Sequence, residues 1–399
     1  MSRSLRYRVE SSGNSGVRTS RLRFVLMAIS VFALVTGMWA GLLRLGWALP
    51  ALGATLPGAH SALMVGGFLG TLIGLERAVA LRRRWAYIAP LLSGLGGLAL
   101  LLTLGLRNTP DLPLPLWAAG PFLLTLGSIA LVAVYIAVLR KQFTLFTSAM
   151  ALGAVVWACG NIFWMVWLPI YQTALWWAGF LVLTILGERL ELTRMLPRAA
   201  ASQTLFLLAA GTYTVGIVLS VPLHDLGARV MGAGMLGLAL WLARYDIARR
   251  TVRQQGLTRF IAASLLAGYA WLMLAGVLAA LFGGVAAGPR YDALLHSIFL
   301  GFVFSMIFAH APVILPAVTG LALPFRSAFY AHVALLQLSL VLRVGSDLAG
   351  WADGRQWGGL LNVIALLLFM GNTALAVLAG KRVASRTRSS NTQRVASSE

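Results

Sequence analysis

Twelve long apolar segments divide this chain, and each is long enough to cross the hydrocarbon core of a bilayer as a helix of about 20 residues. They are residues 22–46, 58–81, 86–105, 116–139, 144–168, 173–190, 203–221, 228–244, 259–283, 291–317, 327–349 and 357–380. None alternates polar and apolar residues as the strands of an outer-membrane barrel do. The sequence therefore predicts an all-α fold, a polytopic transmembrane bundle of about 12 helices.

Composition excludes a soluble protein. Hydrophobic residues make up 59% of the 399 residues and charged residues only 11%, which is more apolar surface than a soluble domain of this length could bury. The net charge of +21 does not indicate nucleic-acid binding, because the basic residues lie in short clusters between apolar segments. A single cysteine, Cys159, excludes an internal disulfide and a cysteine-based metal cluster.

The placement of lysine and arginine predicts the topology. With the N-terminus inside, 26 of the 32 basic residues fall on the cytoplasmic side and 6 fall outside. The outer ones are Arg44, Arg107, Arg229, Arg290, Arg343 and Arg355. We therefore expect both termini to be cytoplasmic. Residues 22–380 are expected to form a single transmembrane domain, between disordered basic tails at 1–21 and 381–399.

Four of the five histidines fall in or near membrane spans, where polar side chains are costly and often functional. His60 and His296 lie near the outer ends of two spans that both run inward. His310 follows His296 by 14 residues, which on an ideal α-helix places it on the same face and about 21 Å deeper. His332 lies near the same inner boundary. The spacing predicts an outer pair, His60/His296, and an inner pair, His310/His332.

Two imidazoles that face each other from different helices can hold a haem iron from both sides, as imidazole is a good iron ligand. The other interpretation of the outer pair is that each histidine forms its own hydrogen bonds in the bundle. Asp292 lies one turn before His296, where its carboxylate could accept the second ring N–H and orient the ligand. A second metal or haem near His310 and His332 is a further expectation.

Basic and small residues near the outer pair have two interpretations each. Three arginines at the outer ends of spans could pair with haem propionates or could simply reach the membrane surface; they are Arg44, Arg290 and Arg343. Three glycines after His60 could leave space for a flat macrocycle or allow close helix packing; they are Gly67, Gly70 and Gly74.

A short sequence echo marks the inner ends of two spans. Glu76-Arg77 closes the second span and Glu188-Arg189 closes the sixth, each shortly after a glycine. Ion pairs that fix the helix ends are one interpretation. The other is a site that handles protons or anions together with His310 and His332.

The layout resembles the haem–copper oxidase superfamily and, more closely, the NnrS-type membrane proteins. The similar runs are Gly58-Ala59-His60-Ser61-Ala62-Leu63-Met64, Gly66-Gly67-Phe68-Leu69, His296-Ser297 with Gly301-Phe302, and His310-Ala311-Pro312. The resemblance implies twelve helices, a low-spin haem near the outer face on His60 and His296, and a role in electron transfer or nitrosative-stress defence in the bacterial inner membrane. The sixth and seventh spans carry no histidine, so the copper ligands of the oxidases are missing.

Three classes of function remain open on the sequence. The first is a haem b protein for electron transfer or nitric-oxide handling, with a redox partner protein and, if it is an enzyme, haem-dependent oxidoreductase activity. The second is a proton-coupled transporter of a small solute. The third is an accessory membrane protein whose histidines are structural.

Overall fold

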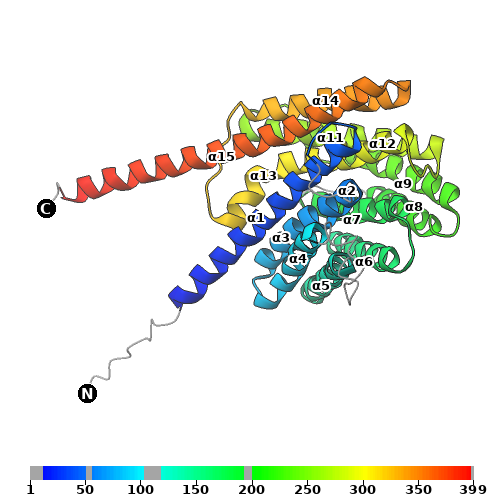
Figure 1. The fold of residues 1–399 in the computed structure, drawn as a ribbon. Helices are drawn as coiled ribbons and strands as arrows, with labels where there is room; N and C mark the ends of the chain where they lie inside the picture. Colours follow the sequence, from blue (N-terminus) through cyan, green and yellow to red (C-terminus); the bar gives the residue numbers. More distant parts are fainter. Residues whose placement is uncertain (1–11, 51–55, 103–117, 193–199, 397–399) are drawn as a thin grey trace, which may run out of the picture.

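A computed structural model describes residues 12–50, 56–102, 118–192 and 200–396, and Figure 1 shows their arrangement as a bundle of helices. Within these ranges every regular element is a helix, and twelve helical stretches are long and apolar enough to cross a membrane. The predicted all-α polytopic bundle is confirmed, and the chain is a multi-pass membrane protein.

Most spans consist of one helix. These helices are α1 (Ser12–Arg44), α5 (Ala119–Lys141), α6 (Leu145–Val166), α7 (Ile170–Leu192), α8 (Ala200–Leu219), α9 (His224–Tyr245), α11 (Gly256–Phe282), α14 (Phe329–Ala349) and α15 (Ala352–Ala396). The third span joins a short 3-10 turn, η2 (Arg84–Tyr87), to α4 (Ile88–Leu102), and α10 (Ala248–Thr251) lies between α9 and α11.

Two spans, the second and the tenth, are interrupted by π-helix. The second consists of α2 (Leu56–Ala62), the π-helix η1 (Leu63–Gly70) and α3 (Thr71–Leu81). The tenth consists of α12 (Pro289–His296), the π-helix η4 (Ser297–Phe304) and α13 (Ser305–Thr319). Each π-helix begins within three residues of a histidine of the predicted outer pair.

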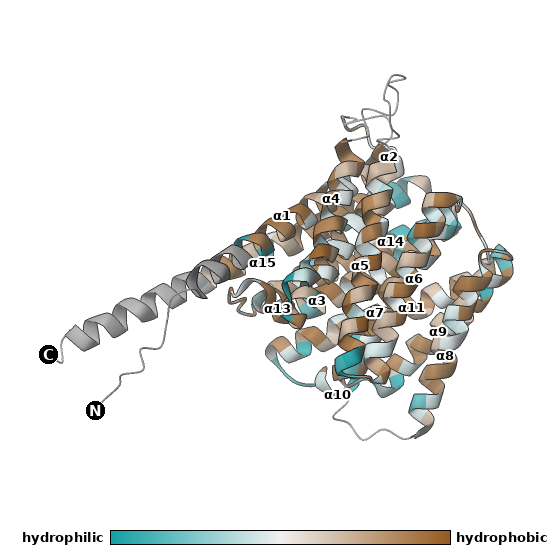
Figure 2. Cartoon of the chain, turned by 90° about the horizontal axis from the view of Figure 1, so that it is seen from below, coloured by the Kyte–Doolittle hydropathy of each residue, from teal (hydrophilic) through white to brown (hydrophobic). Residues whose placement is uncertain are grey.

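The centre of the bundle is α7. In its most apolar 18-residue window 89% of the residues are buried, a larger share than in any other described span. Its neighbours in the chain, α6 and α8, both pack against it. Figure 2 shows that apolar residues cover the sides of the helices and that hydrophilic residues gather mostly near helix ends. This distribution is the one expected for a bundle with lipid as its outer solvent.

Local sequence explains several helix ends. Thr144 caps α6 by exchanging hydrogen bonds with Thr147, which satisfies backbone donors at the first turn. α13 and α14 end at Gly320 and Gly350, whose φ angles of +73° and +70° suit glycine and not a residue with a Cβ atom.

Both terminal helices leave the bundle at the same end, as an even number of spans requires (Figure 1). α1 begins at Ser12 and α15 ends at Ala396, so both enter the tails that were predicted to be disordered. Residues 1–11 and 397–399 of those tails lie outside the described part of the chain.

Candidate functional site: two facing histidines

The imidazole rings of His60 and His296 face each other across the second and tenth spans. Their centroids are 6.5 Å apart and their planes differ by 29°. Metal–imidazole bonds are about 2 Å long, so a metal ion between two Nε2 atoms places the ring centroids about 6 to 6.5 Å apart. The pair therefore has the spacing that a shared metal ion needs.

Backbone carbonyls fix the proton on each ring. The Nδ1 atom of His60 lies 2.7 Å from the carbonyl oxygen of Gly37, and that of His296 lies 2.9 Å from the carbonyl oxygen of Asp292. A carbonyl oxygen only accepts, so each Nδ1 carries the hydrogen and donates it. Neither Nε2 has a hydrogen-bonding partner within the described residues. Each ring is thus held in the tautomer whose Nε2 lone pair is free to bind a metal.

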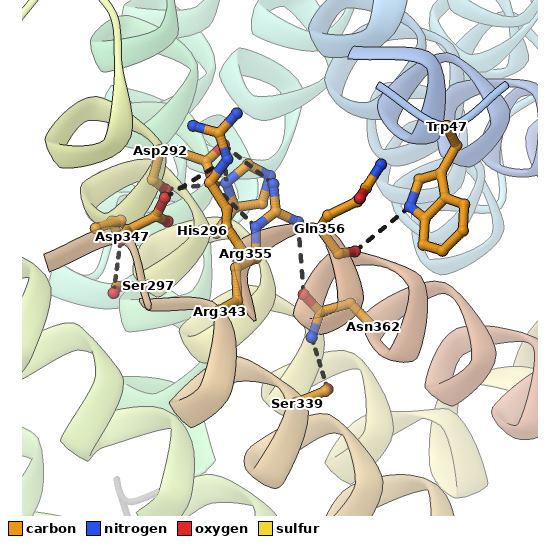
Figure 3. A network of polar contacts seen from close by, with 11 residues as sticks. Trp47, Asp292, His296, Ser297, Ser339, Arg343, Asp347, Arg355, Gln356 and Asn362 are labelled. Carbon is orange, nitrogen blue, oxygen red and sulfur yellow. Dashed lines mark hydrogen bonds and ion pairs between the residues drawn. The ribbon is translucent and has the colours of Figure 1, made fainter. Parts of the chain in front are cut away.

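Asp292 connects His296 to Arg343. Its carboxylate lies 3.2 Å from His296 Nδ1 and accepts two hydrogen bonds from the Arg343 guanidinium, at 2.9 and 3.0 Å. Arg343 is buried, and it also contacts Asn362, which donates to Ser339 (Figure 3). Arg343 therefore fixes the position of the Asp292 carboxylate, and this carboxylate in turn orients the ring of His296.

The other two outer arginines differ from Arg343. Arg44 interacts electrostatically with His60 and forms no ion pair within the described ranges. Arg290 lies over the ring of Phe282, 4.8 Å from its centroid. Arg44 is therefore the arginine best placed to meet an acidic group of a ligand at the His60 side.

Glycines approach the histidine pair from α1 rather than from the second span. A Cβ atom on Gly41 would lie 3.0 Å from Cε1 of His60. The three glycines after His60 pack against neighbouring helices instead: Gly67 against Ala33 and Gly97, Gly70 against Trp157, and Gly74 against Pro90. The structure supports close helix packing for this strip.

A second group of polar side chains lies at the predicted cytoplasmic end. One nitrogen of Arg77 lies 2.7 Å from both Glu76 and Glu188, so the two similar helix ends meet in one ion-pair cluster. Arg189 forms a buried pair with Asp246 at 2.8 and 2.9 Å.

The two inner histidines have different partners. Nε2 of His310 lies 3.5 Å from Arg189. His332 is buried among phenylalanine rings, with its Nδ1 atom 3.3 Å from Asn372 and its Nε2 atom without a partner among the described residues. The rings around it are those of Phe260, Phe308, Phe329 and Phe369. In the described part of the chain no contact joins the two histidines, and no three His, Cys, Asp or Glu side chains gather as a metal site.

The sequence interpretation missed two acidic residues. Asp246 completes the pair with Arg189. Asp347 is buried beside the outer network, 3.9 Å from Arg355, and neither carboxylate oxygen has a hydrogen-bonding partner within the described ranges (Figure 3). A signal was available, because acidic residues in or beside apolar spans are rare and usually have a role. Only 11 acidic residues occur in the whole chain.

Comparison with known proteins places the chain in a family. The model of a domain of unknown function, DUF8744, matches residues 23–378. The chain belongs to this family. The match covers all twelve spans except the ends of the first and last, so the histidine pair and the inner cluster both lie within the shared domain. No curated protein and no solved structure matches the chain.

Proposed function

We propose that the chain is a haem-binding electron-transfer protein of the bacterial inner membrane, with His60 and His296 as the two axial ligands of one haem b near the outer face. The observation that carries the proposal is the facing pair of imidazoles, 6.5 Å apart, each with Nδ1 engaged by a carbonyl. Helix packing alone does not require two facing imidazoles that both leave Nε2 without a partner among the described residues.

The residues around the pair have defined roles in this proposal. Gly37 and Asp292 hold the two rings, and Arg343 holds Asp292. Arg44 would meet a propionate, since it forms no ion pair with the described residues and lies near His60. A haem with two imidazole ligands transfers single electrons and has no vacant position for a gas. Electron transfer, with a redox partner at the outer face and a link to nitrosative stress, is therefore favoured over direct nitric-oxide binding.

Visible spectra of purified protein test the proposal. We expect wild-type protein made with ample haem supply to show a sharp low-spin α band when reduced, and little response to carbon monoxide. His60→Ala and His296→Ala should each lose this band, either with the haem or by forming five-coordinate iron. His224→Ala is the matched control, because His224 lies against Tyr171 at the start of α9 and should leave the spectrum unchanged.

Two results would contradict the proposal. The first is a colourless wild-type protein under these conditions, in which case proton-coupled transport becomes the leading interpretation. The second is an unchanged spectrum in both single variants, which would place any haem elsewhere in the chain. Size-exclusion profiles of all variants separate loss of a ligand from loss of the fold.

A further inference from the structure

The inner cluster around Arg77 plays no part in the proposed haem site. Glu76 and Arg77 come from α3, and Glu188 comes from α7. A single nitrogen of Arg77 lies 2.7 Å from a carboxylate oxygen of each glutamate. The side chains are 14% to 22% exposed, so they are largely removed from solvent but can still be reached by small species.

Among the described residues, the charges around this cluster do not balance. The carboxylates are those of Glu76, Glu188, Glu191 and Asp246, and the guanidinium groups are those of Arg77 and Arg189. Asp246 accepts two bonds from Arg189 and one from the backbone of Ala248, so its charge is well compensated. Within the described ranges, Arg77 is therefore the one guanidinium group that forms an ion pair with Glu76 and with Glu188. A buried carboxylate without its own counter-charge is costly, and two carboxylates at one site disfavour each other's ionised form.

His310 does not supply the missing positive charge. Its Nδ1–H donates to the carbonyl oxygen of Met306 at 2.7 Å, and its Nε2 faces Arg189 at 3.5 Å. An arginine N–H only donates, so Nε2 accepts and the ring is neutral. The other ionisable groups near the cluster are Glu191 on α7, Tyr269 on α11 and Tyr135 on α5. α1 also packs against α3, but its Arg23 side chain donates to Tyr87 and not to a glutamate of the cluster.

A buried hydroxyl group also points to a missing partner. Tyr135 is 1% exposed and interacts electrostatically with Arg77, Glu188 and Glu76. Its hydroxyl group has no hydrogen-bonding partner among the described residues. A buried hydroxyl group usually forms a hydrogen bond. A nearby carboxyl group that binds and releases a proton would give the Tyr135 hydroxyl group a partner in one of its two protonation states.

We propose that Glu76 and Glu188 form a proton-binding site that takes up one proton from the cytoplasmic side and releases it again. Uptake forms an O–H bond on one carboxylate and involves no electron transfer. A metal cation fits less well, because the guanidinium group of Arg77 lies between the carboxylates and repels it. Hard cations also require several oxygen ligands, about six for calcium or magnesium, whereas a proton needs only one.

Infrared spectroscopy of the full-length protein in lipid nanodiscs tests this site. We expect wild-type protein at neutral pH to show the C=O stretching band of a protonated carboxyl group, shifted in D2O. Glu76→Gln and Glu188→Gln should each remove the band, because the remaining carboxylate then has Arg77 to itself. Tyr135→Phe should shift the band without removing it, since it takes away only the hydroxyl group.

Controls assign the band to the cluster. The glutamine variants are compared in an Asp347→Asn background, because Asp347 is also a buried carboxyl group without a hydrogen-bonding partner among the described residues and can contribute a band of its own. Asp225→Asn, at an exposed ion pair, should leave the band unchanged. The proposal is wrong if the Asp347→Asn protein shows no such band, or if the band survives when Asp347→Asn is combined with either glutamine variant. It is also wrong if replacing potassium with sodium abolishes the band, which would indicate a cation site.

Discussion

At the scale of single residues, backbone carbonyls decide what the two outer histidines can do. Gly37 and Asp292 each engage an Nδ1 atom, and the Asp292 carboxylate links His296 to a buried arginine. A ring held in this way loses little rotational freedom when it binds a metal, which favours binding. The neighbouring α1 residue Gly41 sets how far the His60 ring can move, because no side chain stands between them.

Gly41→Ala tests this contact. The added Cβ atom would lie 3.0 Å from the His60 ring, so the ring must move and its bond to Gly37 must weaken. We expect haem affinity to fall about 10-fold, the lower end of the range for disturbing a ligand's supporting contacts. Haem titration of the apoprotein measures it. Gly371→Ala is the control, since a Cβ atom there meets nothing within 4 Å and should leave affinity unchanged.

At the scale of helices, the two π-helical segments are the features that most affect the site. A π-helix pairs residues five apart, and such segments occur often at functional sites. One extra residue inserted into an α-helix rotates the part of the helix that follows it by about 100° about the helix axis. The ideal-helix calculation that placed His310 on the face of His296 therefore does not hold through η4. Phe68 and Phe304, each eight residues after a histidine of the pair, stack with their ring centroids 5.9 Å apart.

Deleting Phe299 from η4 tests the role of the π-helix. The tenth span has 31 residues and stays long enough to cross a membrane. Without the extra residue the segment can become α-helical, and His296 then turns by about 100° relative to α13. We expect the haem content per protein to fall to background, as measured by pyridine haemochrome assay. Deleting Ala286 from the exposed loop before α12 is the control and should keep haem; equal haem in both deletions would contradict this role.

At the scale of the whole molecule, the bundle gives the protein two polar sites at opposite ends of the second span. His60 and Glu76 share the second span, and His296 and His310 share the tenth. The site at His60 and His296 is proposed to bind haem, and the site at Glu76 and Glu188 is proposed to bind a proton. Because both sites use the second span, a movement of that span would affect both.

Reporter fusions check the orientation of this arrangement. Fusions after Leu49 and Ala286 should report the outer side, and fusions after Gln254 and Leu321 the cytoplasmic side. The physical reason is that basic residues retained inside set the orientation of each span. All four positions lie between spans of the structure, so a fusion there interrupts no helix. A reversal at any one position would contradict the twelve-span topology with both termini inside.

The number, length and helical nature of the spans could be determined from the sequence alone, because lipid leaves a long apolar segment no other way to satisfy its backbone. The depth of His60 and His296 followed from counting along the spans. Their approach to 6.5 Å, the turn introduced by η1 and η4, and the pairing of Asp292 with Arg343 depended on the tertiary structure. So did the pairing of Arg189 with Asp246 and the meeting of Arg77 with Glu188. Hydropathy and spacing describe one helix at a time, whereas these contacts depend on how helices distant in sequence pack against one another.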